Sequence, residues 1–154
     1  MEGGEYKYEF NKEFYQLLNF FSQKLYYKKM YCMKRMFESE EENEFLYDRN
    51  IEEDEHYMDY FEKNRRKKYK QNSWYNVSEI IDEIISLVNY LIGDHVMNVK
   101  GEMSLSTCIK LLKPKLNYYI SHPQVTNDQI AFMSGMLGLL QQLKSMPEYK
   151  QIQF

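Results

Sequence analysis

Apolar and polar positions alternate with the period of a helix along most of the chain. After Asn11, a residue that caps helix N-termini, apolar side chains recur at spacings of three and four residues and predict a first helix with one buried stripe. The stripe consists of Phe14, Leu17, Leu18, Phe21 and Leu25. From residue 26 to 37, basic residues alternate with tyrosine and methionine, so we expect the helix to continue there with a half-exposed face.

Two more helix starts are indicated in the first half. Ser39 with Glu42 forms a capping box and predicts a short second helix through residues 45–47. Asn50 with Glu53 repeats the signal and predicts a third helix that ends in a basic segment, residues 63–70. Acidic residues at its start and basic residues at its end suit the helix dipole.

The second half is more apolar, and we place a boundary between the halves at residues 71–76. Ser78 is the expected cap of a central helix, and Gly93 is its expected stop. The apolar positions of this helix cover more than one face: Ile80, Ile81, Ile84, Ile85, Leu87, Val88, Leu91 and Ile92. Residues 94–103 are expected to form a loop.

A further helix should start at Ser104 or Ser106 and either kink at Pro114 or be replaced there by a second helix over residues 115–120, because proline lacks the N–H that a helix needs. Thr126 with Gln129 forms another capping box, which predicts a last helix ended by Pro147. Residues 148–154 are interpreted as a tail in which Ile152 and Phe154 could dock.

These elements predict an all-α fold of about five to six helices, divided into a charged, tyrosine-rich segment (1–73) and an apolar helical module (74–154). The chain has 154 residues, 44% of them hydrophobic, which is enough for a core. Three prolines and six glycines are too few for an all-β design.

Charge and cysteine usage limit the kinds of site and the compartment that we expect. The formal net charge is −3, and Cys32 and Cys108 belong to no Cys-x-x-Cys pair, so neither a disulfide framework nor a zinc site is expected. The N-terminal residues show no secretory signal, and no segment is long and apolar enough to span a bilayer. We therefore expect a reducing compartment, nuclear or cytoplasmic.

Catalytic motifs are missing from the sequence. The three histidines are isolated from one another, and neither a nucleophile elbow nor a glycine-rich phosphate loop occurs. Glu53 and His56 form a single Glu-x-x-His, whereas a di-iron site needs a second copy and further glutamates. Asp94 and His95 are interpreted as a turn after a helix. We expect no catalytic residue, no metal and no cofactor.

The basic segment is the most specific feature of the sequence. Six of the eight residues 63–70 are basic, in a chain that is acidic overall. Such a segment on a helix favours contact with nucleic acid. The alternative is a solvated helix end that balances the acidic runs at residues 38–44 and 52–55. The candidate nucleic-acid-binding residues are Lys63, Asn64, Arg65, Arg66, Lys67, Lys68 and Lys70.

Residues 61–70, FEKNRRKKYK, resemble the end of a homeodomain recognition helix, in which an aromatic pair precedes Asn-Arg-Arg. The resemblance implies that Asn64 reads adenine, that the neighbouring cations hold phosphates, and that Tyr69 replaces the usual tryptophan. Lys63 is one residue more than the homeodomain pattern has, so we expect phosphate contact more than base reading.

A degenerate homeobox-like segment joined to a helical docking part resembles the accessory subunits of protist DNA adenine methyltransferase complexes. The catalytic Asp-Pro-Pro-Trp motif is absent, which implies a non-catalytic role. The sequence thus predicts a DNA-binding accessory subunit that docks onto a larger protein complex.

The alternative is a helical protein–protein adaptor with an incidental basic surface, its groove formed by helices 80–92 and 130–143. The predicted partner interface comprises Trp74, Ile81, Ile85, Val88, Ile92, Phe132, Met136, Leu139 and Leu143.

Overall fold

The computed structural model describes residues 7–47 and 72–153, and in these ranges the fold is all-α, as predicted. The five helices are α1 (Lys12–Tyr47), α3 (Ser73–Ile92), α4 (Leu105–Ile120), α5 (Asn127–Ser145) and the short α6 (Tyr149–Ile152). The predicted third helix and the whole basic segment lie outside the described residues.

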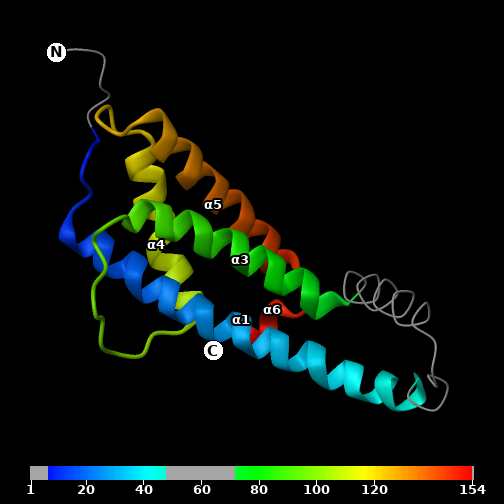
Figure 1. Cartoon of the computed structure of the whole chain (residues 1–154). Helices are drawn as coiled ribbons and strands as arrows, with labels where there is room; N and C mark the ends of the chain where they lie inside the picture. Colours follow the sequence, from blue (N-terminus) through cyan, green and yellow to red (C-terminus); the bar gives the residue numbers. More distant parts are fainter. Residues whose placement is uncertain (1–6, 48–71, 154) are drawn as a thin grey trace, which may run out of the picture.

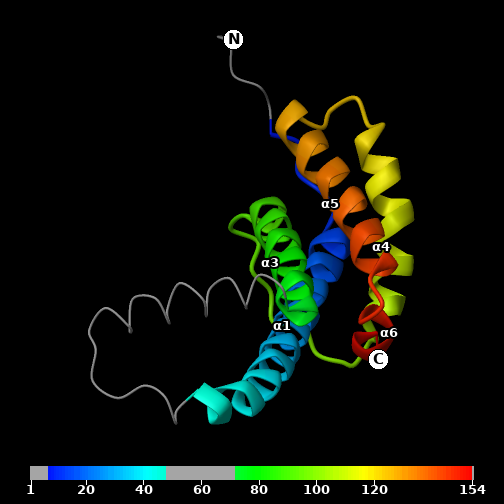
Figure 2. The same cartoon turned by 90° about the vertical axis from the view of Figure 1, so that its right-hand side faces the viewer.

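The four long helices pack as a bundle in which α1 and α5 each contact both α3 and α4. Figures 1 and 2 show α3 and α4 on opposite sides of the bundle, with α1 and α5 between them. Neighbours run in opposite directions, whereas α3 and α4 run in the same direction, so residues 93–104 return along the whole length of the bundle (Figure 1). One long crossover connection of this kind is a known variant of helical bundles.

The described parts of both halves share one hydrophobic core. Fully buried side chains come from α1, α3, α4 and α5, and no gap separates the first half from the second. Large members of this core are Phe14, Leu18, Phe21, Leu25, Ile81, Ile84, Leu112, Leu116, Met133 and Leu140. At the boundary predicted at residues 71–76 the composition of the chain changes, but residues from both sides of it belong to the same core.

The first helix is much longer than predicted. It runs without a break for 36 residues and passes through Ser39, so the expected second helix start there is wrong. Residues 12–47 contain neither glycine nor proline and are rich in glutamate, lysine, leucine and methionine, which all favour helix. A capping sequence does not end a helix where the residues before it already propagate one. Asn11 does cap this helix: its Oδ1 accepts a hydrogen bond of 2.8 Å from the Phe14 N–H.

The start of α3 also differs from the prediction. Its cap is Asn72, whose Oδ1 accepts from the Trp74 N–H over 2.9 Å. Ser78 lies inside the helix, where its hydroxyl donates to the Tyr75 carbonyl over 2.7 Å. The predicted stop is confirmed: Gly93 has a φ of 55°, which favours glycine, and its N–H donates to the Asn89 carbonyl.

The second half otherwise follows the sequence. Ser104 caps α4, which continues through Pro114 to Ile120 as one helix, so of the two alternatives at Pro114 the second helix is the one that is wrong. The Thr126–Gln129 capping box opens α5 as predicted. Beyond Pro147, Tyr149 and Ile152 of α6 are buried against the core, which confirms the docking of Ile152.

Candidate functional site

The predicted nucleic-acid-binding residues, Lys63 to Lys70, lie outside the described residues, and so do Glu53 and His56. Their roles therefore stay predictions. In the rest of the chain, the candidate sites are surfaces that the bundle itself builds.

The predicted partner interface is divided by the fold. Five of its side chains belong to the chain's own core and are at most 4% exposed: Ile81, Val88, Ile92, Met136 and Leu143. As core residues of α3 and α5 they cannot line an open groove, and the predicted interface needs correction at these positions. The other members, Trp74, Ile85, Phe132 and Leu139, pack against the core but stay partly exposed. Periodicity alone could not separate the two groups, because the apolar positions of α3 cover more than one face.

The outer face of α4 gathers basic side chains. The inner face is fixed by core residues, with Leu105, Cys108, Leu112 and Leu116 all fully buried. Lys110 and Tyr118, whose side chain is 63% exposed, point away from the core, whereas Lys113 and Lys115 are half-buried and lie on opposite flanks of the helix. We call Lys110, Lys113, Lys115 and Tyr118 the α4 basic face.

This face has no acidic neighbours on its own helix. The sequence of α4 contains no aspartate or glutamate. Within the described ranges, none of its three lysines forms an ion pair, whereas Lys29 pairs with Asp82 over 2.7 Å. The positive charge of the α4 basic face is therefore not compensated locally, and it is available to an anionic partner.

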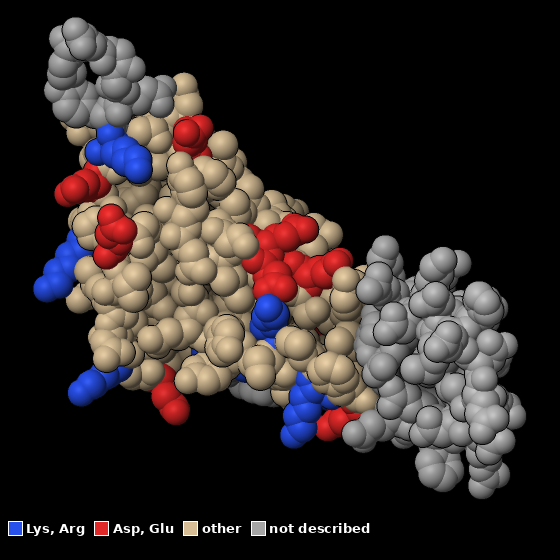
Figure 3. Space-filling model, viewed as in Figure 1, with Lys and Arg blue, Asp and Glu red and all other residues tan. Residues whose placement is uncertain are grey.

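The opposite side of the bundle is acidic. Glu79, Asp82 and Glu83 project from α3 into solvent, and Figure 3 shows acidic side chains gathered over this helix. Because α3 and α4 lie on opposite sides of the bundle (Figure 2), the described ranges carry the carboxylates of α3 and the lysines of α4 on opposite sides. A polyanion would approach by way of α4 and would be repelled from α3.

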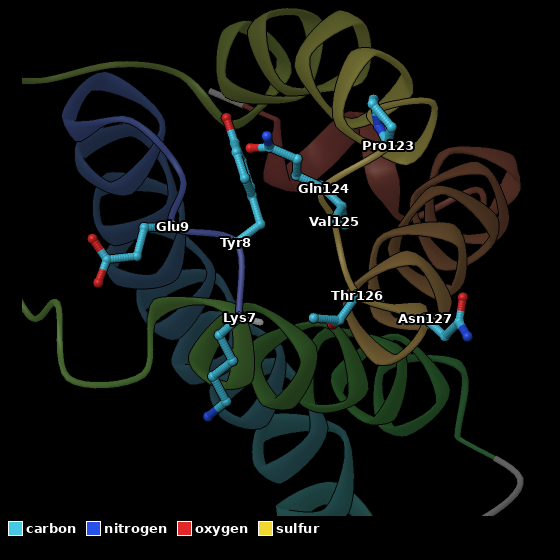
Figure 4. A pocket seen from close by; sticks show the side chains of 8 residues that line it. All are labelled: Lys7, Tyr8, Glu9, Pro123, Gln124, Val125, Thr126 and Asn127. Atoms are coloured by element: carbon cyan, nitrogen blue, oxygen red, sulfur yellow. The ribbon is translucent and has the colours of Figure 1, made fainter. Parts of the chain in front are cut away.

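A hollow of about 700 Å³ lies where the N-terminal segment crosses the turn between α4 and α5. Its lining residues are Lys7, Tyr8, Glu9, Pro123, Gln124, Val125, Thr126 and Asn127. Figure 4 shows the charged ends of Lys7 and Glu9 pointing to different sides of the segment, while Tyr8 lies towards Gln124. The charged groups of the hollow do not converge on one point, so it offers no acid–base pair.

The two described histidines have packing roles. The His95 ring stacks on Tyr15 at 4.1 Å, and the His122 ring lies 4.6 Å from Tyr8. The His95 N–H donates to the Ile92 carbonyl, which makes residues 92–95 the turn that the sequence predicted. No group of three potential metal ligands occurs among the residues that the structure covers.

Both cysteines are poor nucleophiles. Cys32 and Cys108 are free thiols buried in the core. Burial, which disfavours the thiolate, raises the pKa of Cys32 to about 12 and that of Cys108 to about 11. Neither thiol is activated for covalent chemistry.

No family model, no curated protein and no solved structure matches this chain. The resemblance of residues 61–70 to a homeodomain helix thus rests on those residues alone. None of the described helices is long and apolar enough to cross a membrane.

Sequence reasoning missed the α4 basic face. A signal was present: residues 105–120 hold three lysines and no carboxylate, in a chain with 23 acidic and 20 basic residues. What the sequence lacked was the direction of these side chains, because the proline at position 114 left it open whether one helix or two would carry them.

Proposed function

We propose that this protein is a non-catalytic, nucleic-acid-binding accessory subunit, with DNA as the favoured ligand. The observation that carries the proposal is the α4 basic face: Lys110, Lys113 and Lys115 with the exposed Tyr118, and no carboxylate on the helix. The basic residues of 63–70 support it from the sequence.

The chemistry of this face suits a phosphate backbone. Each lysine is a compact charge on a flexible stem, which can reach a phosphate without needing a fixed angle. The three lysines of α4 span about 8 Å along the helix axis, which suits contact with neighbouring phosphates of a duplex. Tyr118 adds a hydroxyl for a phosphate oxygen and a ring that can stack on an unpaired base. We expect affinity without strong sequence preference, because phosphate contacts carry no sequence information.

The accessory role rests on the partly exposed apolar side chains of α3 and α5. Tyr90 is 48% exposed and lies with its ring 3.8 Å from that of Phe132, so the two helices present an aromatic pair at the surface. Ile85 and Leu139 of the predicted interface are also partly exposed. Aromatic residues at a half-buried surface are typical of protein interfaces, and this surface is proposed to hold the larger subunit.

The test is a titration of fluorescein-labelled duplex DNA of about 20 base pairs, long enough for a bound helix, followed by fluorescence anisotropy over a series of salt concentrations. A triple variant, Lys110→Gln, Lys113→Gln and Lys115→Gln, should bind more weakly. Its slope of log affinity against log salt should be smaller by about 2.7, the loss of three phosphate contacts.

A charge-matched control removes three lysines elsewhere: Lys100→Gln, Lys144→Gln and Lys150→Gln. This control should keep most of the wild-type salt slope. An equal loss of slope in both triple variants would mean that only the net charge matters, and not the position of the lysines. A second variant, with Arg65, Arg66, Lys67 and Lys68 replaced by alanine, measures how much the basic segment contributes to the affinity for DNA. Wild-type binding in both the α4 variant and this variant would overturn the proposal.

A further inference from the structure

A second apolar stripe runs along α1, on a face that the core does not use. Tyr26, Met30, Met33 and Phe37 follow one another at spacings of four, three and four residues, which places them on one face of the helix. Tyr26 is 56% exposed, Met30 49% and Phe37 47%, and Met33 is half-buried. We call these four residues the α1 stripe.

The stripe is distinct from the core-facing side of the same helix. With about 100° of rotation per residue, the buried residues Leu25, Cys32 and Met36 lie about 110° away from it around the helix. Figures 1 and 2 show this half of α1 extending beyond the ends of α4 and α5, away from the body of the bundle. A shallow hollow of about 490 Å³ lies here, lined by Met30, Met33 and Phe37 with Lys34 and Glu38 at its edge.

The order of residues in the α1 stripe is complementary to itself. When two helices pack antiparallel, residues face each other if their numbers add up to a constant. With a sum of 63, Tyr26 faces Phe37 of a second copy, and Met30 faces Met33. Each aromatic ring then packs against an aromatic ring, and each thioether packs against a thioether. Side chains of similar size therefore face each other along the whole contact.

One cation beside the stripe agrees with the same register. Lys34, Tyr27 and Glu38 lie on one flank of the α1 stripe, and Tyr27 is 69% exposed. In the antiparallel pair, Lys34 comes next to Tyr27 of the second copy, where a cation can lie over the ring. Two-fold symmetry produces every one of these contacts twice.

We propose that the α1 stripe binds a second copy of this chain, with the two α1 helices antiparallel about a two-fold axis between residues 31 and 32. The paired segment of 12 residues is about 17 Å long, so the dimer belongs to the weak, concentration-dependent class. The proposal uses other residues than the α4 basic face, and it holds whether or not the protein binds nucleic acid.

Analytical ultracentrifugation of the full chain over a wide concentration range tests the proposal. The mass should rise from 18.9 kDa towards twice that value. Met30→Glu or Phe37→Ser should raise the dissociation constant about tenfold or more, because each removes an apolar contact of the stripe twice. The two positions are exposed, so circular dichroism should show an unchanged helix content.

Leu111→Glu is the matched control. Leu111 is 44% exposed on α4, away from the stripe, and this variant should dimerise like wild type. A protein that stays monomeric at every concentration overturns the proposal and leaves the stripe to a different partner. A dimer that Met30→Glu and Phe37→Ser do not weaken overturns it as well, since another surface then holds the copies together.

Cross-linking tests the direction of the helices. A mixture of Met30→Cys and Met33→Cys chains should form a disulfide between the two variants under mild oxidation, whereas Met30→Cys alone should form much less. The native thiols do not interfere, because Cys32 and Cys108 are buried. Efficient cross-linking of Met30→Cys with itself would overturn the antiparallel register.

Discussion

Asn19 of α1 holds Met97 of the long crossover connection: the Met97 N–H donates to Asn19 Oδ1 over 3.0 Å. The Nδ2 group of Asn19 donates to the His95 carbonyl at 2.9 Å and to the Tyr15 carbonyl at 2.7 Å. The side chain is only 5% exposed, so this buried amide has partners for both of its donors and for its acceptor. It fixes a loop that has no regular structure of its own to the first helix.

Replacing Asn19 by leucine should lower the free energy of unfolding by roughly 1–3 kcal/mol, because the substitution leaves partly buried backbone groups of the loop without partners. Urea denaturation followed by circular dichroism measures the loss. Ser22→Ala is the control: Ser22 donates to Asn89 Oδ1 over 3.2 Å at an exposed position, and its loss should cost less than about 0.5 kcal/mol. Equal effects of the two substitutions would contradict the role given to Asn19.

Gln129 joins the N-terminal segment to α5. Its Oε1 accepts from the Thr126 N–H and its Nε2 donates to the Tyr8 carbonyl, both over 3.1 Å. Gln129→Glu keeps the acceptor of the capping box but loses the donor to Tyr8. Amide hydrogen exchange should therefore become faster at residues 7–10 and stay unchanged within α5.

Thr126→Ala is the complementary variant. It removes the hydroxyl that accepts from the Gln129 N–H, and it should cost about 1 kcal/mol through the helix cap. If Gln129→Glu destabilises α5 as much as Thr126→Ala does, the contact with Tyr8 is not what the substitution removes.

Cys32 makes stability depend on alkaline pH. Burial raises the pKa of this thiol from 9.0 to about 12, so above pH 9 the unfolded chain loses the proton before the folded chain does. The contribution of Cys32 to stability is complete below pH 9 and is lost as the pH rises towards 12, by up to about 1.4 kcal/mol per pH unit.

The comparison of wild type with Cys32→Ala isolates this effect from other titrating groups. The difference in unfolding free energy should be constant between pH 7 and 8 and should decrease between pH 9.5 and 10.5. Urea titrations at these pH values give the two curves. Parallel curves throughout would mean that the thiol titrates normally in the folded protein.

Trp74, the single tryptophan, reports on the contact between α1 and α3. The guanidinium carbon of Arg35 lies 5.3 Å from the centre of its ring, and the Tyr31 ring meets it edge-on at 5.7 Å. Arg35→Gln should shift the fluorescence emission to longer wavelength, because it uncovers the ring, and should cost about 0.5–1 kcal/mol. Lys34→Gln removes a neighbouring cation that does not cover Trp74 and should leave the spectrum unchanged.

Local signals in the sequence determined most helix ends of the second half. Gly93, Ser104 and the Thr126–Gln129 box act through hydrogen bonds or a backbone angle within a few residues, so their effect can be read without knowing the fold. The all-α class followed in the same way from apolar spacing and from the small number of glycines and prolines. The same local reading failed at Ser39 and Ser78, where a continuing helix overrides a capping residue.

Tertiary structure alone decided which apolar and charged faces are free. Ile81 and Ile85 look equivalent in the sequence of α3, but packing against α1 and α5 buries the first fully and leaves the second partly exposed. Lys110, Lys113 and Lys115 are carried by a single helix because α4 continues through Pro114, and the carboxylates of α3 lie on the far side of the bundle. Periodicity gives the angle of a residue around its own helix, whereas its exposure depends on where the neighbouring helices lie.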